Sequence, residues 1–220
     1  MNFNDLIKLL TVLSNCYCLN LTILDYHDPL ANHILDAEII DNTLIVSAMI
    51  QGIEFYDITN PTELDHIAHF TLSGGGGGGG VKSNCVSAND DYAYFTSNNG
   101  VYIVDISNPN NPINNGSISG TSNLILENLK VKNDVLAVCA HEDGVLLYNL
   151  SNPSNPSYAS TIMTENSWAV ELNNEYAYVS DENNLLIIDI SNLNSPEVII
   201  SFDTGNAIKD ISIEENYLYL

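Results

Sequence analysis

The chain has 220 residues, of which 45% are hydrophobic, and it carries 5 Lys or Arg against 28 Asp or Glu, a formal net charge of −23. The hydrophobic content excludes an intrinsically disordered chain. The charge excludes binding of nucleic acid or docking on anionic lipid, because both need an excess of cationic side chains. No apolar run reaches the roughly 18 residues of a membrane-spanning helix, so we expect no membrane insertion.

The first segment does not have the composition of a secretory signal peptide. Asn2, Asn4 and Asp5 provide no positively charged start, and Lys8 interrupts the apolar stretch that follows. Residues 21–29 instead resemble a phrase that returns later in the chain. We therefore assign residues 6–35 to a first, degenerate repeat.

The repeated segment, called the phrase below, is an apolar run that ends in Asp or Asn. Pro or Leu stands four residues after that Asp or Asn. It occupies residues 52–61, 100–109, 144–153 and 184–193, and a degenerate copy occupies residues 21–29. Its anchor residues are Asp25, Asp57, Asp105, Asn149 and Asp189, and all seven prolines stand at one of two fixed distances after an anchor. Without the glycine run at residues 74–80, most anchors lie about 40 residues apart, a period typical of propellers and solenoids.

Three further short segments accompany each phrase. Residues 43–47, 92–96, 135–139 and 176–180 are rich in aromatic and β-branched side chains, and segments just upstream alternate apolar with polar residues. A fourth segment follows the prolines, as at residues 64–72 and 196–202. Short alternating segments bounded by Asn, Asp, Gly and Pro are typical of β-strands. The sequence therefore predicts an all-β chain, a β-propeller of four-stranded antiparallel blades.

We expect one propeller domain over residues 1–220. Its blade repeats cover about residues 6–35, 36–72, 83–120, 124–164 and 167–204, and a half-repeat covers residues 207–220. The glycine run at residues 74–80 is an insertion in this scheme. It leads into a strand, not a helix N-terminus that would hold a phosphate, so we do not expect nucleotide binding.

Two arrangements of the chain ends remain open. Residues 21–35 could supply the outer strands of the blade that residues 207–220 begin, which gives about five blades. Alternatively, residues 6–19 already form the inner strands of a first blade, and the chain is a fragment of a larger propeller. An unpaired half-blade exposes a strand edge, so the second arrangement predicts self-association near residues 217–220, which a monodisperse monomer would contradict.

The anchor residues are predicted to organise turns. An Asp or Asn at a strand end accepts hydrogen bonds from backbone N–H groups just downstream, and a following Pro stops the strand ladder. We therefore interpret Asp25, Asp57, Asp105, Asn149 and Asp189 as structural turn anchors and not as metal ligands.

These phrases resemble the LVIVD repeat of prokaryotic and related β-propellers. The resemblance is closest at residues 103–109 and at residues 176–181 with 186–191; it covers residues 37–220 and, weakly, residues 6–36. Asn149 in place of the anchor Asp and Leu193 in place of a Pro depart from the pattern. The resemblance implies the propeller fold and an extracellular or cell-surface location. It implies little about activity.

An acidic rim is one candidate for chemistry. Glu142, Asp143, Asp181 and Glu182 fall in turns between the second and third strands of two consecutive blades. Together they could hold a divalent cation. A solvated acidic surface is the favoured alternative, because the Asp-x-Asp spacing of calcium loops is absent.

Histidine and cysteine show no catalytic or metal-binding spacing. His66 and His69 lie three positions apart on an expected strand, so we expect them to point to opposite faces. The four cysteines are expected to be small core residues, with two disulfides as the alternative. They are Cys16, Cys18, Cys85 and Cys139.

We therefore expect a non-catalytic propeller module that serves as a scaffold for a protein, carbohydrate or other ligand. We predict no catalytic residue and no cofactor beyond the divalent cation considered above. An enzyme with a central-channel site built from dispersed residues is one alternative, and a fragment without independent function is another. Polar side chains with shifted pKa values at a channel mouth would favour the enzyme.

Overall fold

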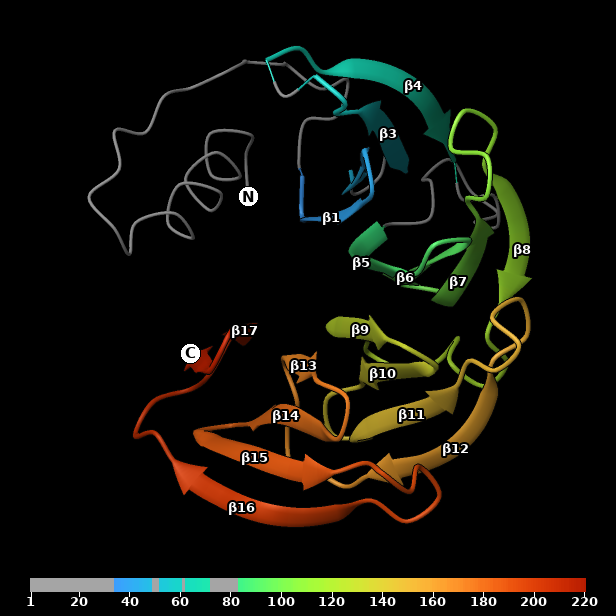
Figure 1. Ribbon diagram of the computed structural model, residues 1–220. Helices are drawn as coiled ribbons and strands as arrows, with labels where there is room; N and C mark the ends of the chain where they lie inside the picture. Colours follow the sequence, from blue (N-terminus) through green and yellow to red (C-terminus); the bar gives the residue numbers. More distant parts are fainter. Residues whose placement is uncertain (1–33, 49–51, 61, 72–82) are drawn as a thin grey trace.

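The computed structural model describes residues 34–48, 52–60, 62–71 and 83–220. Within these ranges the chain forms strands β1 to β18 and no helix. The strands make four antiparallel four-stranded sheets and one two-stranded sheet. The sheets are arranged as blades around a common centre, with the first strand of each blade innermost (Figure 1). The predicted all-β propeller of four-stranded blades is confirmed.

Each blade runs from its innermost to its outermost strand in chain order. The blades are β1 (Asp36–Ile40), β2 (Thr43–Ser47), β3 (Ile53–Asp57) and β4 (Asp65–Phe70); β5 (Ser83–Ala88), β6 (Tyr92–Ser97), β7 (Gly100–Asp105) and β8 (Ile113–Ser117); β9 (Asn128–Lys132), β10 (Val135–Cys139), β11 (Val145–Asn149) and β12 (Ser157–Ile162); β13 (Val170–Leu172), β14 (Tyr176–Asp181), β15 (Asn184–Asp189) and β16 (Glu197–Asp203); and the half-blade β17 (Ser212–Glu214) and β18 (Tyr217–Tyr219).

The hydrophobic core lies between successive blades. Side chains of one strand point alternately to its two faces, so a second strand with a blade on either side is apolar throughout. In β10, Leu136 and Val138 pack toward the preceding blade, while Ala137 and Cys139 pack toward the following one. This two-sided burial explains why the segments around β10 and β14 lack polar alternation.

Two of the cysteines are core residues, as expected. Cys85 and Cys139 are buried free thiols, so the alternative of two simultaneous disulfides is wrong. Cys16 and Cys18 lie outside the described residues.

The anchor residues cap the turns after the third strands. In each case the side-chain Oδ1 accepts a hydrogen bond from the backbone N–H two residues downstream. The donors are Thr59 to Asp57 at 2.7 Å, Ser107 to Asp105 at 3.0 Å, Ser151 to Asn149 at 2.8 Å and Ser191 to Asp189 at 2.8 Å. Hydrogen bonds from the Thr59 and Ser191 side chains, together with these backbone bonds, lower the pKa of Asp57 and Asp189. An amide oxygen accepts the same bond as a carboxylate, so Asn149 preserves the turn. Asp25 lies outside the described residues.

A β-bulge in the outer strand of the first blade overturns one expectation. In the β3–β4 register, His66 pairs with Tyr56 and His69 with Glu54, and Ile67 is the extra residue. The bulge shifts the alternation by one position, so both imidazoles reach the same face. His66 Nε2 lies 2.6 Å from Glu54 Oε2, and His69 Nδ1 lies 2.9 Å from Glu54 Oε1. The prediction that the two histidines point to opposite faces was wrong.

Gly144 is required where the third blade turns into its third strand. Its φ is +86°, and a Cβ there would collide with the carbonyl oxygen of Ile162. We expect Gly144→Ala to lower the free energy of unfolding by about 2 kcal/mol, from left-handed strain plus the displaced outer strand. Gly205 has φ +77° with nothing within 4 Å of its Cβ position, so Gly205→Ala should cost only about 1 kcal/mol. Urea unfolding of both variants measures the difference, and equal losses would contradict the steric argument.

Strands β17 and β18 form a two-stranded sheet. Strand β17 pairs only with β18 among the described strands, in a register that joins Ile213 to Leu218. Leu218 packs with Leu185 and Ile211 against the fourth blade. The suggested pairing of this half-blade with residues 21–25 lies outside the described residues, so both arrangements of the ends stay open. Among the described residues, no helix is long and apolar enough to cross a membrane.

Candidate binding site at the channel mouth

The innermost strands place four polar side chains at one level around the centre. Glu38, Ser87, Lys130 and Glu171 occupy the same repeat position, because each pairs with the third residue of the second strand in its blade. In the second, third and fourth blades, the residues on either side of this position pack in the core between blades, as alternation along a strand predicts. The repeat thus builds a polar ring from four separate blades.

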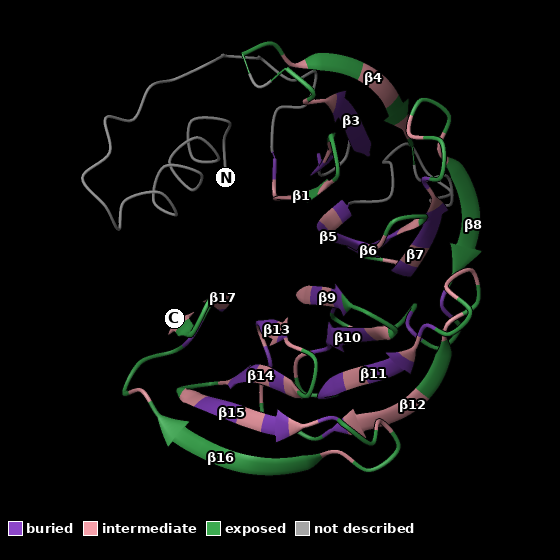
Figure 2. Ribbon diagram, in the orientation of Figure 1, coloured by how far each residue is buried: buried purple, intermediate pink, exposed green. Residues whose placement is uncertain are grey.

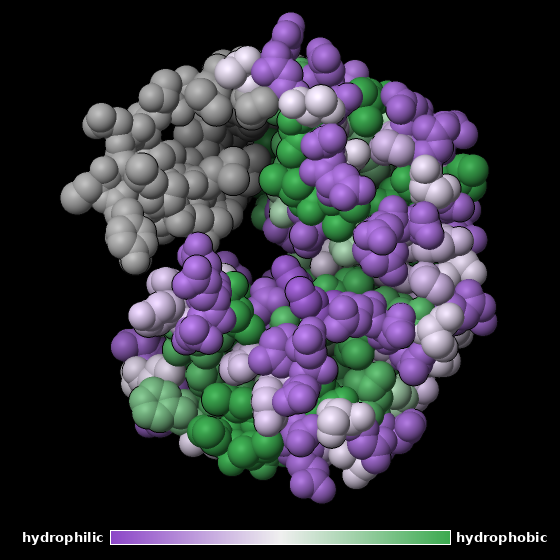
Figure 3. All heavy atoms as spheres, viewed as in Figure 1, coloured by the Kyte–Doolittle hydropathy of each residue, from purple (hydrophilic) through white to green (hydrophobic). Residues whose placement is uncertain are grey.

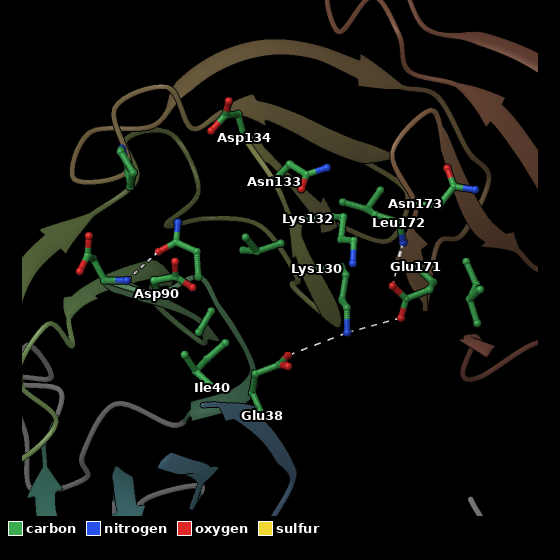
Figure 4. A pocket seen from close by; sticks show the side chains of 16 residues that line it. Glu38, Ile40, Asp90, Lys130, Lys132, Asn133, Asp134, Glu171, Leu172 and Asn173 are labelled. Atoms are coloured by element: carbon green, nitrogen blue, oxygen red, sulfur yellow. Dashed lines mark hydrogen bonds and ion pairs between the residues drawn. The ribbon is translucent and has the colours of Figure 1, made fainter. Parts of the chain in front are cut away.

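Lys130 joins two carboxylates within this ring. Its Nζ lies 3.4 Å from Glu171 Oε2 and 3.9 Å from Glu38 Oε2 (Figure 4). The Ser87 hydroxyl donates to Glu38 Oε2 at 3.2 Å and accepts from the Val131 backbone N–H at 3.1 Å. The network therefore ties the first four blades together, and Glu38, Lys130 and Glu171 of it line the central pocket.

A pocket of about 780 Å³ opens above this network. This volume lies within the range of small-ligand sites. Figure 3 shows hydrophilic residues around the centre of the ring. The turns between first and second strands form the rim, with Asp90, Asp91 and Asp134 exposed there. The other lining residues are Glu38, Ile40, Ala88, Asn89, Lys130, Val131, Lys132, Asn133, Pro153, Glu171, Leu172, Asn173 and Ile213.

The pKa shifts in the ring keep Lys130 in its charged, unreactive form. Burial raises the pKa of the Glu38 carboxyl, and the nearby Lys130 charge opposes that rise. Burial also lowers the pKa of the Lys130 ammonium, but the charges of Glu171 and Glu38 outweigh it and raise the pKa above its ordinary value. Lys130 therefore remains an ammonium at neutral pH and is not a nucleophile.

A second polar pair lies deeper, between the first and second blades. Asp36 Oδ2 accepts from the Cys85 thiol and from the Val86 backbone N–H, both at 2.9 Å, and Asp36 Oδ1 accepts from Ala37 N at 2.8 Å. Burial raises the pKa of Asp36 despite these bonds, and burial together with the Asp36 charge raises the pKa of Cys85. Since the thiolate is the nucleophilic form, Cys85 is unreactive and the pair is structural.

The shift at Asp36 predicts a pH dependence. Because its pKa is higher in the folded chain than in the unfolded one, its stabilising contribution is full below the unfolded pKa and is lost as pH rises through the folded pKa. We expect Asp36→Asn, which cannot ionise, to be less stable than the natural chain by about 1–2 kcal/mol, since its amide faces a backbone donor. Urea unfolding between pH about 4 and 7 should show this deficit shrinking as pH rises. A deficit that grows with pH would contradict the assignment.

The four residues of the expected acidic rim lie at the other end of the blades. Asp181 Oδ1 accepts from the backbone N–H groups of Glu165 and Asn166 at 2.8 and 3.0 Å, so it holds the connection between two blades. Glu142, Asp143 and Glu182 are exposed. In the described part of the chain, no group of three or more His, Cys, Asp or Glu side chains could hold a metal ion.

Near these turns lies a cluster around the single tryptophan. Lys209 Nζ stands 3.1 Å from the centroid of the Trp168 ring, and the His141 ring stands 4.7 Å from it. His141 Nε2 in turn lies 2.7 Å from Glu127 Oε1. A cation over an indole face is attracted by the ring quadrupole. The cluster links the last three blades and leaves no open platform on the Trp168 face that Lys209 covers.

Comparison with known proteins agrees with this architecture. A family model described as the LVIVD repeat matches residues 79–120 and 166–204, which contain the second and fourth blades. These two regions of the chain match the LVIVD repeat. No curated protein matches the chain.

The chain is also similar to a solved structure, that of the computationally designed Ika8 protein. The TM-score is 0.54 at 10% identity, and the alignment covers 84% of this chain and 66% of that one, slightly less than two thirds of its length. At this identity the likeness concerns the fold alone.

Sequence reasoning missed the polar ring. Glu38, Lys130 and Glu171 are charged residues at one repeat position, each between two apolar neighbours on its strand. Comparison of the repeats position by position would have shown this signal. The anchor residues and the acidic turns were predicted instead, because each forms a short motif that is visible in the sequence.

Proposed function

We propose that this chain is a non-catalytic binding module that holds a basic segment of a partner protein at the central pocket. The observation that carries the proposal is the composition of the pocket lining. Five carboxylates face two lysines there, and Lys130 is already engaged by Glu38 and Glu171. The rim carboxylates of Asp90, Asp91 and Asp134 therefore offer negative charge to a cationic ligand.

Carbohydrate is less favoured as the ligand. Among the described lining residues there is no aromatic side chain on which a sugar ring could stack. The Asn side chains at the rim, Asn89, Asn133 and Asn173, provide hydrogen bonds to a peptide backbone equally well. A cell-surface or secreted location, which the family resemblance implies, would present this pocket to other proteins.

The test must separate the pocket from the overall charge of −23. Binding of tetralysine amide is measured by titration calorimetry at about 0.15 M salt, where long-range attraction is largely screened. We expect Asp91→Asn with Asp134→Asn to weaken binding at least tenfold. The matched pair Glu142→Gln with Asp143→Asn removes the same charge at the other end of the blades and should have little effect. Equal weakening by both pairs would show that only the overall field attracts the peptide.

A second candidate function is an enzyme with its site in the same pocket. It is favoured by the raised pKa of Glu38, which lies in a cleft and would suit a general acid. Lys130 of this ring stays protonated and the deeper Cys85 stays a thiol, so neither is an activated nucleophile. Loss of a hydrolytic activity in Glu38→Gln with tetralysine binding retained would favour the enzyme over the binding module.

A further inference from the structure

The outermost strand of the fourth blade presents an apolar edge to solvent. All residues of β16 are exposed, and Figure 2 shows the strand green along its whole length. The exposed fractions of its large side chains are 55% for Val198, 53% for Ile199, 47% for Ile200 and 59% for Phe202. Within the described sheets β16 is a terminal strand, so its outer N–H and C=O groups face solvent.

The other outer strands lack this apolar character. Strand β8 carries Asn114, Asn115 and Gly116, the last with φ +94°, and only Ile113 is a large exposed apolar residue there. In strand β4 two histidines are hydrogen-bonded to Glu54, and β12 consists mostly of Ser, Thr and Ala. Proteins protect free edges with charged side chains, Pro or β-bulges, and β16 has a bulge at Ile199. In β16 the run from Val198 to Phe202 contains only one polar residue, Ser201.

The charges around β16 determine which strand could pair with it. Glu197 and Asp203 stand at the two ends of the strand, within a chain of net charge −23. Antiparallel pairing with a second copy would place acidic ends side by side, and like charges directly opposite each other are destabilising. A strand with basic ends would instead place opposite charges together.

We propose that β16 is a docking edge for an extended segment of another protein, with alternating apolar residues between basic ends. The segment adds a fifth strand to the fourth blade by main-chain hydrogen bonds. Its apolar side chains cover Ile200 and Phe202, which share one face of β16 beyond the bulge at Ile199, and its basic ends meet Glu197 and Asp203. This surface lies on the outside of the ring and does not depend on the central pocket.

The test uses the full chain and a dye-labelled peptide, Lys-Val-Thr-Val-Thr-Val-Lys, followed by fluorescence anisotropy. We expect saturable binding that weakens at least tenfold when both Lys are replaced by Glu. We also expect Ile200→Asn to weaken binding at least tenfold. Its matched control, Ile113→Asn, alters an equally exposed apolar residue on outer strand β8 and should bind like the natural chain.

Three results would overturn the proposal. Equal binding by Ile200→Asn and Ile113→Asn would place the peptide elsewhere on the surface. Equal binding of the Lys-ended and Glu-ended peptides would remove the charge argument. The natural chain could also fail to bind the peptide and instead form a dimer in sedimentation analysis. If Ile200→Asn dissociates that dimer, a second copy is the occupant of β16.

Discussion

Replacing Lys130 by Met should lower the free energy of unfolding by about 3 kcal/mol at neutral pH. The substitution keeps most of the aliphatic stem but removes the cation that Glu38 and Glu171 share. Removing one partner from a partly buried ion pair is costly because the remaining charges stay partly desolvated. Here two carboxylates would also repel each other across the centre of the ring. Urea unfolding at pH about 7 measures the loss.

Lys132→Met is the matched control, because Lys132 lies on the same strand and is exposed. We expect it to change stability by less than about 0.5 kcal/mol. Adding Glu38→Gln to Lys130→Met should recover part of the loss, since it removes one of the two repelling charges. If Lys130→Met and Lys132→Met behave alike, the polar ring does not hold the blades together.

The double variant His66→Ala with His69→Ala should lose about 4 kcal/mol of stability. Glu54 has no exposed surface, and the two imidazoles supply the hydrogen bonds to its two carboxylate oxygens. Without them a carboxylate is left buried with its lone pairs unsatisfied, which is among the costliest changes in a protein interior. Thermal or urea unfolding of the pair of variants measures the loss.

A triple variant separates this mechanism from simple loss of side-chain packing. Adding Glu54→Leu to the two histidine replacements removes the buried carboxylate that has lost its partners and leaves an apolar side chain of similar size. We expect it to be at least about 2 kcal/mol more stable than the double variant. A triple variant that is no more stable would show that the histidines act through packing alone.

The strands could be predicted from sequence because their pattern is local and repeated. Anchor residues such as Asp105 and the alternation around Lys130 need only neighbouring positions to be interpreted. The shared face of His66 and His69 could not be predicted, because a bulge is a property of two paired strands and shifts the alternation of only one. The distance from Lys130 to Glu38 likewise depends on how the blades close around the centre.

The pocket could not be predicted from the sequence for the same reason, because it depends on how the blades lie in three dimensions. Equivalent repeat positions place Glu38, Lys130 and Glu171 at one level, which the repeat itself contains. Whether these side chains meet is decided by blade tilt and by the width of the ring, and no spacing in the chain encodes either. The linear acidic motif at Glu142 and Asp143 was conspicuous for the opposite reason, since its residues are adjacent in sequence and solvated in the structure.

Trp168 is the only tryptophan in the chain, and its ring lies close to His141 of the preceding blade and to Lys209 just before the half-blade. Its emission on selective excitation therefore comes from one known point, at the junction of three blades. An imidazole beside the indole is a quencher when protonated, and the ammonium group shifts the indole's electronic environment. The fluorescence emission of Trp168 therefore reports on the packing of the last three blades against one another.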